Sequence, residues 1–185
     1  MSPAITCPEP ALRGELFVLR AFRSSDFESA RLLGLRSAES RWIEELPESD
    51  AESMSLACER NRLDGSMLHL VISDPSDDGY LGEVSLVMLE PGMAELGCAV
   101  VPEARGRGIA SQSLAVLSDW ALRELSLRRL QVAVDARNTA ALKLAQNAGY
   151  RREGLLRSLW EVDGERMDAV MFSRLPGDPV PARSG

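Results

Sequence analysis

The chain has 185 residues, of which 45% are hydrophobic and 26% are charged, and its formal net charge is −7 at pH 7. This length and composition predict one globular domain with a sizeable core. The negative charge argues against nucleic acid as the main ligand, because phosphate binding needs a basic face, whereas it suits a cationic substrate or simply keeps the protein in solution.

The N-terminus and the cysteines indicate a reducing compartment. Residues 1–10 (MSPAITCPEP) lack a basic segment followed by an apolar one, so we expect no signal peptide. No apolar run approaches the length of a membrane span. Cys7, Cys58 and Cys98 are widely spaced, as expected of a protein without a disulfide framework. We therefore expect a cytoplasmic protein without a membrane partner.

The sequence contains one histidine, His69, within the apolar run LHLVIS. A histidine-rich metal site or a Ser-His-Asp triad is hard to build from a single histidine, and we expect no metal. We interpret His69 as a hydrogen-bonded residue of a sheet rather than as a catalytic residue.

The N-terminal third predicts an arm, a strand and two helices. Residues 1–14 contain three prolines and predict a flexible arm. Ser24 or Ser25 is a suitable N-cap for the first helix. The elements are a strand at 15–22, a helix from there to about Gly34, an irregular stretch at 37–50, and a helix from Asp50 to about Leu63.

Three strands follow, joined by short turns. The turns are DPSDDG and Pro91-Gly92, which predict antiparallel neighbours. Pro102 ends the last of these strands, since proline cannot donate to a ladder. The predicted strands are 67–73, 80–90 and 93–102.

The remaining elements alternate before a final hairpin. Asn138 is a natural N-cap and Gly149 a natural residue beyond a helix C-terminus. Asp163-Gly164 predicts the hairpin turn. The elements are a helix at 108–125, a strand at 129–136, a helix from Asn138 to Gly149, and strands at about 151–161 and 165–174.

This order predicts an α+β fold with one mixed, mostly antiparallel sheet of about seven strands and flanking helices. The helix at 108–125 is a crossover, which makes strands 93–102 and 129–136 parallel. We expect one domain over residues 15–175 and a disordered tail at 176–185, which is rich in proline and glycine.

The stretch PEARGRGIASQSL (102–114) places small residues and arginines between a strand and a helix. Gly106, Gly108 and Ala110 expose backbone N–H groups at a positive helix end, while Arg105 and Arg107 add charge. This pattern predicts a pyrophosphate site. A plain tight turn with two exposed arginines would account for it as well.

Two common phosphate motifs do not fit this stretch. A Walker A motif requires a lysine after its second glycine, and no such run exists. The Rossmann fingerprint requires a third glycine where Ser111 stands, and too few βαβ units follow Asp135 for a dinucleotide fold.

The stretch AELGCAVVPEARGRGIASQSL (94–114) resembles the core motif of the GNAT superfamily of N-acetyltransferases, whose cofactor is acetyl-CoA. The family pattern [RQ]-x-x-G-x-[GA] is met by Arg105, Gly108 and Ala110. NTAALKLAQNAGYRREG resembles the family's asparagine-containing helix followed by Gly-Phe/Tyr. Both ends of the resembling region, roughly residues 14–175, are similar to the branch that acetylates ribosomal-protein N-termini.

The resemblance implies an acetyl-CoA-dependent N-acetyltransferase acting on a primary amine, with a protein N-terminal α-amine as the expected acceptor. It implies a strand that splays near Val100 and Val101, and a loop whose N–H groups hold the CoA pyrophosphate. The implied cofactor-binding residues are Val100, Val101, Arg105, Gly106, Arg107, Gly108, Ile109, Ala110, Ser111 and Asn138.

The resemblance also implies a general base, because only a neutral amine is a nucleophile. Glu95 matches the glutamate of the branch's A-E-[IL]-G segment. It could instead be a strand carboxylate that is exposed or paired with an arginine. For the acceptor we expect Trp42, Glu45 and Trp160, although each equally suits a surface or packing role.

Three positions depart from the family pattern. Ala145 stands where many members carry a tyrosine as general acid, and Ala141 where the branch often has serine. Cys98 replaces an aromatic residue and is either a small buried residue or a reactive thiol. The departures leave open a non-catalytic acyl-CoA-binding protein. The sequence is also compatible with a polyamine or aminoglycoside-like acceptor. A nucleotide-dependent oxidoreductase is a third interpretation of the function. The protein could assemble as a homodimer.

Overall fold

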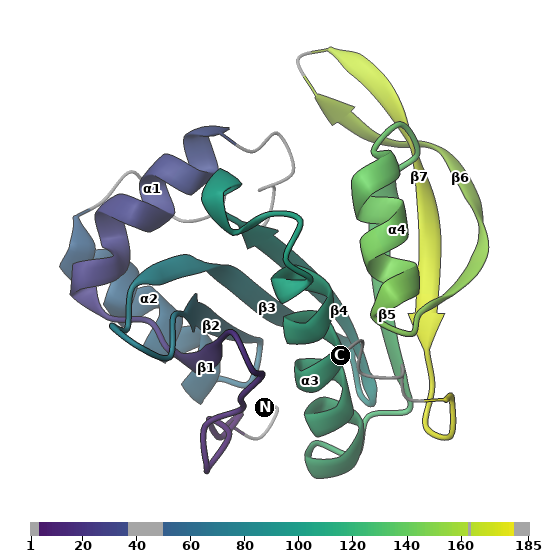
Figure 1. The fold of residues 1–185 in the computed structure, drawn as a ribbon. Coiled ribbons are helices and arrows are strands. Elements are labelled where there is room, and N and C mark those ends of the chain that lie inside the picture. Colours follow the sequence, from purple (N-terminus) through teal and green to yellow (C-terminus); the bar gives the residue numbers. More distant parts are fainter. Residues whose placement is uncertain (1–3, 37–49, 163, 180–185) are drawn as a thin grey trace.

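The computed structural model describes residues 4–36, 50–162 and 164–179, and its seven-stranded sheet has the order β1-β2-β3-β4-β5-β7-β6 (Figure 1). No helix in these described ranges is long and apolar enough to cross a bilayer. The elements are β1 Val18–Ala21, η1 Ser24–Asp26, α1 Phe27–Arg36, α2 Ala51–Leu63, β2 Met67–Ser73, β3 Tyr80–Glu90, β4 Met93–Val100, η2 Pro102–Ala104, α3 Ile109–Glu124, β5 Arg129–Asp135, α4 Thr139–Asn147, β6 Arg151–Val162 and β7 Glu165–Arg174.

The predicted α+β fold and its sheet are confirmed. β2, β3 and β4 are antiparallel neighbours, and α3 carries the chain to β5, which is parallel to β4. Two caps follow the sequence: Asp50 accepts from the N–H groups of Glu52 and Ser53, and Gly149 has a φ of 85° just beyond α4. The predicted cap at Ser24 or Ser25 is wrong, because both residues lie inside η1, whose N-cap is Arg23. The first strand is shorter than predicted, at Val18–Ala21.

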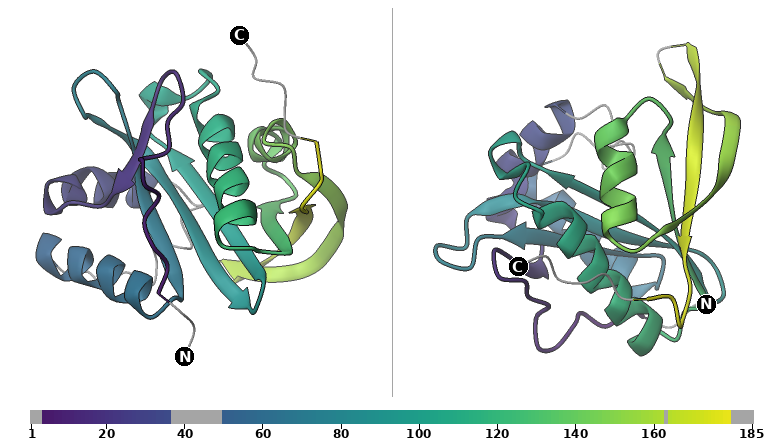
Figure 2. Two further views of the ribbon diagram at one scale, coloured as in Figure 1. Left: turned by 90° about the horizontal axis from the view of Figure 1, so that it is seen from below. Right: turned by 45° about the vertical axis from the view of Figure 1, so that its right-hand side comes forward.

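The helices cover both faces of the sheet (Figure 2). On one face, α3 and α4 pack on alternate strand residues, including Leu86 of β3, Leu96 of β4 and Leu130 of β5. On the other face, Val71 of β2 packs with Ala30 of α1 and Met54 of α2. Because strand side chains alternate between faces, Glu95 and Gln131 lie on the face opposite α3.

The predicted flexible arm is anchored where the structure describes it. Ile5 is buried, its N–H donates to the Arg62 carbonyl oxygen at 2.9 Å, and the Arg62 guanidinium donates back to the Ile5 carbonyl oxygen at 3.0 Å. These contacts attach residues 4–14 to α2, because one buried apolar side chain and two hydrogen bonds oppose local chain entropy.

One ion pair predicts acid sensitivity of the fold. Arg129 donates to both carboxylate oxygens of Glu153, at 2.8 and 2.7 Å, and Ser173 Oγ donates at 2.6 Å. The Arg129 and Ser173 hydrogen bonds lower the pKa of Glu153 from 4.5 to about 2. The folded state therefore binds this proton more weakly, so the stabilisation is present above pH 4.5 and is lost as the pH falls towards 2.

We expect Glu153→Gln to remove that part of the pH dependence. In urea unfolding, the free energy of unfolding of the variant should fall less than that of the wild type between pH 4.5 and the acid limit. Glu90→Gln, at the exposed end of β3, is the control and should follow the wild type. Parallel acid profiles for the Glu153 variant and the wild type would contradict the prediction.

Candidate active site

β4 and β5 pair over a short length and then diverge (Figure 1). Their parallel ladder joins Met93 to Arg129, Ala94 to Leu130 and Glu95 to Gln131, and it extends no further in the described ranges. β4 itself continues to Val100, paired on its other side with β3. A wedge therefore opens between the two strands, with its apex at Glu95.

The hydrogen-bonding pattern of β3 and β4 shows which backbone groups face this wedge. The Val101 N–H donates to the Leu81 carbonyl oxygen at 2.9 Å, so Val101 points towards β3. In an antiparallel ladder the direction alternates with each residue. The backbone groups of Leu96, Cys98 and Val100 consequently face the wedge, which suits the predicted role of Val100 but not a free N–H at Val101.

Beyond β4, the loop at 105–108 and the first turn of α3 present unused donors. The Arg105 N–H donates to the Pro102 carbonyl oxygen at 3.2 Å and is thus occupied. The next six backbone N–H groups have no hydrogen-bond acceptor among the described residues. They belong to Gly106, Arg107, Gly108, Ile109, Ala110 and Ser111, the last three in the helical turn whose N–H groups lack intrahelical acceptors.

Glycine is required at two positions of this loop. Gly106 and Gly108 have φ values of 73° and 75°, in the left-handed region that side chains disfavour. A Cβ at Gly106 would meet nothing within 4 Å, so the space over its backbone is open. The side chains of Arg105 and Arg107, the chain neighbours of Gly106, are exposed, and Arg105 Nε donates to the Val100 carbonyl oxygen at 3.4 Å. Free N–H groups, a helix N-terminus and two cations fit a pyrophosphate.

Asn138 caps α4, on the far side of the wedge from β4 (Figure 1). Its Oδ1 accepts from the Ala141 N–H at 3.0 Å, which leaves its amide group for a ligand. Ala145 is fully buried in the core beneath α3 and α4. Position 145 therefore packs in the core and supplies no general acid.

Glu95 sits at the wedge apex and is 9% exposed. Gln131 Nε2 donates to Glu95 Oε2 at 2.7 Å, while Arg129 donates to Gln131 Oε1 at 3.3 and 3.4 Å. Arg129 thereby fixes which end of the Gln131 amide faces Glu95. Burial raises the pKa of Glu95, and the Gln131 hydrogen bond opposes that shift. The sequence did not indicate Gln131, although the alternation of β5 places it on this face.

Two other carboxylates on this face of the sheet are already neutralised. Glu83 accepts from Tyr80 Oη and is paired with His69 Nε2, and Glu153 is paired with Arg129. The described ion pairs do not include Glu95. Glu95 therefore combines position, a raised pKa and an uncompensated charge, which are the properties required of a general base.

We expect Gln131→Met to shift the pH dependence of this site. The change keeps the size of the side chain but removes the donor that lowers the pKa of Glu95. The pH at which an activity dependent on ionised Glu95 is half maximal should therefore rise, with a smaller change of the plateau rate. A pH profile of kcat/KM measures this; a midpoint that stays fixed would show that the two side chains are not coupled.

The structure brings only part of the predicted acceptor site together. Trp42 and Glu45 lie outside the described residues. Trp160 pairs with Met167 on the β6–β7 hairpin, beyond a register shift that follows Leu156. Cys98 is partly buried against the core, and burial raises the pKa of its thiol to about 12, as expected of a packing residue.

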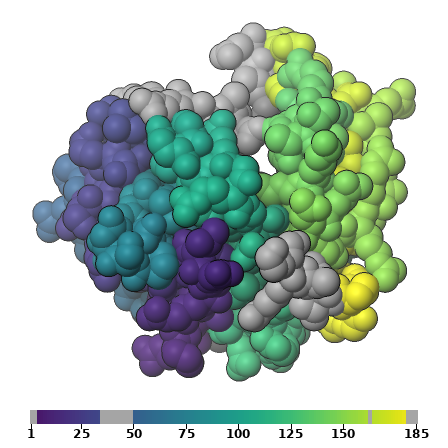
Figure 3. Space-filling view, viewed as in Figure 1, coloured from purple at the N-terminus to yellow at the C-terminus, as the bar shows by residue number. Residues whose placement is uncertain are grey.

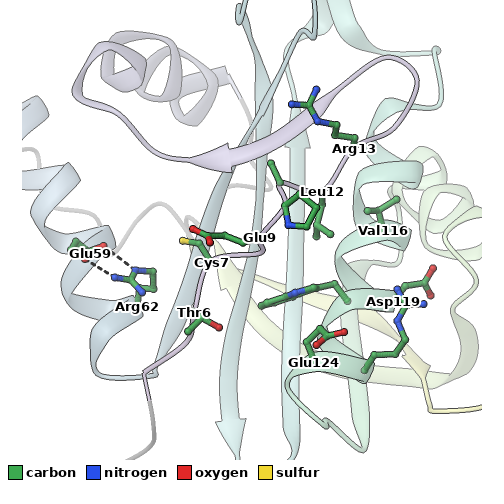
Figure 4. Close-up of a pocket in the computed structure, with 14 residues that line it drawn as sticks. Thr6, Cys7, Glu9, Leu12, Arg13, Glu59, Arg62, Val116, Asp119 and Glu124 are labelled. Atoms are coloured by element: carbon green, nitrogen blue, oxygen red, sulfur yellow. Dashed lines mark hydrogen bonds and ion pairs between the residues drawn. The ribbon is translucent and has the colours of Figure 1, made fainter.

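Two cavities are found among the described residues outside the wedge. A small one of about 130 Å³ lies between α1 and the end of β4, lined by Ser29, Leu32, Leu33, Tyr80, Val101 and Pro102. A larger one of about 970 Å³ lies between the arm, α2 and α3, and its lining includes Glu9, Arg62 and Asp119 (Figure 4). The larger cavity contains none of the loop or wedge residues. In the space-filling view, the arm lies against α3 (Figure 3).

Comparison with known proteins gives a family match. The family model described as "Acetyltransferase (GNAT) domain" matches residues 17–151. An uncharacterized N-acetyltransferase, p20 of Bacillus licheniformis, is 31% identical over 115 residues, or 61% of this chain and 65% of that protein. The probable N-acetyltransferase YjcK of Bacillus subtilis is 28% identical over 60% of this chain. This match covers 62% of YjcK, so the chain spans less than two thirds of the length of both relatives.

Solved structures share the fold at low identity. The ribosomal-protein-S5-alanine acetyltransferase from Vibrio fischeri superposes with a TM-score of 0.75 at 20% identity, over 92% of this chain and 98% of that one. Spermidine N-acetyltransferase from Vibrio cholerae, solved with CoA and spermine, superposes with a TM-score of 0.75 at 23% identity, over 89% of this chain and 98% of that one.

Proposed function

The chain belongs to the GNAT acetyltransferase family, and from that premise we propose that it transfers the acetyl group of acetyl-CoA to a protein N-terminal α-amine. The wedge between β4 and β5, ending at a loop of free N–H groups, is the observation that carries the acetyltransferase proposal. Its two ends match the two needs of the reaction, an anion site and a base.

In this proposal the cofactor pyrophosphate binds the N–H groups of residues 106–111, flanked by Arg105 and Arg107. The acetyl thioester lies towards the apex. Along β4, the distance from Val100 to Glu95 is roughly 16 Å. A wedge-facing N–H of Leu96 or Cys98 stabilises the carbonyl oxygen as negative charge develops. Asn138 contacts the cofactor from α4.

Glu95 then accepts a proton from the acceptor ammonium, directly or through water, and the neutral amine attacks the carbonyl carbon. The N–C bond forms and the C–S bond breaks, and the thiolate of CoA leaves and takes a proton from water. A thiol with a pKa of about 8.5 is an adequate leaving group without a protein acid, which accommodates Ala141 and Ala145.

The charges on the sheet face that carries Glu95 favour an acceptor with one positive charge. Glu83 and Glu153 are neutralised by His69 and Arg129, so Glu95 alone of these three described carboxylates keeps an uncompensated charge. A polyamine carries several charges and needs several free carboxylates. An α-amine carries one.

A polyamine acceptor is the second candidate, and a sequence feature favours it. Residues 37–50 contain Glu39, Glu44, Glu45, Glu48 and Asp50, a concentration of negative charge in the stretch predicted to line the acceptor side. A spermidine N(1)-acetyltransferase of Escherichia coli is 25% identical to this chain over 70% of its length.

Two measurements test the proposal in order. Thermal unfolding should shift upward with acetyl-CoA but not with NADH or ATP, and a ligand at 100 times its Kd adds about 2.7 kcal/mol. CoA release should then be faster with peptides carrying a free N-terminus than with the same peptides N-terminally blocked, or with spermidine. Binding without turnover on any amine would favour a non-catalytic acyl-CoA-binding protein; faster turnover of spermidine would favour a polyamine acceptor.

A further inference from the structure

Away from the wedge, the face covered by α1 and α2 holds a buried chain of polar side chains that the proposed transfer does not use. It runs from Cys58 on α2 through His69 on β2 to Glu83 and Tyr80 on β3. We propose that Cys58 is an activated thiol, held by His69 and Glu83, and a site of oxidation by hydrogen peroxide.

The geometry is that of a nucleophile, a base and an orienting carboxylate. Cys58 Sγ lies 3.4 Å from His69 Nδ1, and the other ring nitrogen, Nε2, contacts Glu83 Oε2. Since Glu83 occupies Nε2, Nδ1 is the nitrogen that serves the sulfur. Phe22 stacks on the imidazole with ring centroids 6.0 Å apart, which holds the ring in this orientation.

The charges of the chain favour an imidazolium next to the sulfur. Burial lowers the pKa of His69, but the charge of Glu83 and the hydrogen bonds with Cys58 and Glu83 raise it to about 10. The Tyr80 hydroxyl donates to the second Glu83 oxygen and keeps the carboxylate in place. Asp26, on η1, also faces Glu83 and Tyr80, and it is itself paired with Arg20.

The His69 Nδ1 beside Cys58 Sγ provides a partner for the thiol proton while the sulfur attacks an electrophile, which is the arrangement of a nucleophile with its base. Cys58 is half-buried at the edge of the small core beneath α2, and the proposal requires that hydrogen peroxide reach its sulfur from solvent. The sulfur attacks one peroxide oxygen, the S–O bond forms and the O–O bond breaks. Hydroxide leaves and takes up a proton, giving a sulfenic acid at Cys58.

The other two cysteines provide internal controls because both are half-buried as well. Burial raises the pKa of the Cys7 thiol, and burial followed by the charge of Glu83 raises that of Cys98 to about 12. Cys98 donates only to the Ala110 carbonyl oxygen, at 3.7 Å. Neither sulfur has an imidazole beside it among the described contacts, so the comparison with these half-buried thiols tests the effect of His69.

The test treats the full chain with hydrogen peroxide in the presence of dimedone, which captures sulfenic acid, and follows each cysteine-containing peptide by mass spectrometry. We expect the Cys58 adduct to form about tenfold faster than the adducts of Cys7 and Cys98. In denaturant the three rates should become equal. Equal rates in the folded protein, or a faster adduct at Cys7, would overturn the proposal.

Variants separate activation from simple access. His69→Gln should slow the Cys58 adduct to the rate of Cys7 while circular dichroism remains that of the wild type. If the loss of a buried partner unfolds this variant, Tyr80→Phe keeps the imidazole and carboxylate and removes only the hydroxyl that fixes Glu83. It should slow the Cys58 adduct measurably, and an unchanged rate in a folded variant of either kind would count against the proposal.

Discussion

Glu95→Gln is expected to lower kcat by about 10²- to 10⁴-fold, the usual contribution of a general base, while the Kd for acetyl-CoA stays unchanged. The substituted amide keeps the size of the side chain and can still accept from Gln131 Nε2, so the fold and the wedge should persist. What disappears is the group that takes the proton from the acceptor ammonium.

The pH dependence gives this prediction a second readout. Burial raises the pKa of Glu95, so the wild-type rate should rise with pH as that carboxyl ionises. In the glutamine variant this limb should vanish, and the remaining rate should follow the fraction of neutral amine alone. Stopped assays of CoA release across a pH series measure both effects.

Glu90→Gln is the matched control, since Glu90 ends β3 in an exposed position away from the apex. It should leave kcat and its pH profile unchanged. A loss of less than about threefold in the Glu95 variant would remove Glu95 as the base, because general-base catalysis contributes far more than that. Acetyl transfer would then depend on water or on the acceptor's own ionisation.

Gly106→Val is expected to weaken acetyl-CoA binding by at least about tenfold and to raise KM with a smaller change in kcat. A side chain at a φ of 73° is strained by about 1–2 kcal/mol. It also fills the open space over the loop backbone, where a Cβ meets no protein atom within 4 Å. The N–H groups of the loop would then be shielded from a pyrophosphate.

Gly177→Val separates the strain from the shielding. Gly177 has a φ of 89° and equally open surroundings, but it follows β7 and is not part of the loop. The two variants should lose comparable thermal stability, and only the Gly106 variant should lose acetyl-CoA binding in calorimetric titration. Full-strength binding by the Gly106 variant would show that the loop does not hold the pyrophosphate.

Local rules were sufficient for most elements. Pro102, Asn138 and Gly149 mark boundaries that the structure shows within one or two residues, because caps and prolines act on the backbone directly. The first strand was predicted too long, because hydrophobic alternation continues past the point where β1 pairs with β2. Residues 1–14 have the composition of a loose arm. Their neighbours in the sequence do not reveal that Ile5 is buried or that Arg62 binds its backbone.

The candidate site divides in the same way. The glycine-arginine loop, Asn138 and Glu95 could be named from the sequence, and their roles in acetyl transfer stay predictions. Gln131 and Arg129 could not be named, because they act on Glu95 across strands distant in the sequence. The Val101 N–H could not be assigned to Leu81 before the register of β3 and β4 was known.

The sequence by itself determined most elements and the mixed sheet, because periodicity, capping and turn chemistry depend on near neighbours. Its resemblance to a known motif indicated the family. Only the tertiary structure decided where β4 leaves β5, which carboxylates are neutralised, and that Cys58, His69 and Glu83 form one chain. Those features depend on burial and on pairing between distant segments. Burial raises the pKa of Glu95, whereas the pairing with Glu83 outweighs burial and raises the pKa of His69.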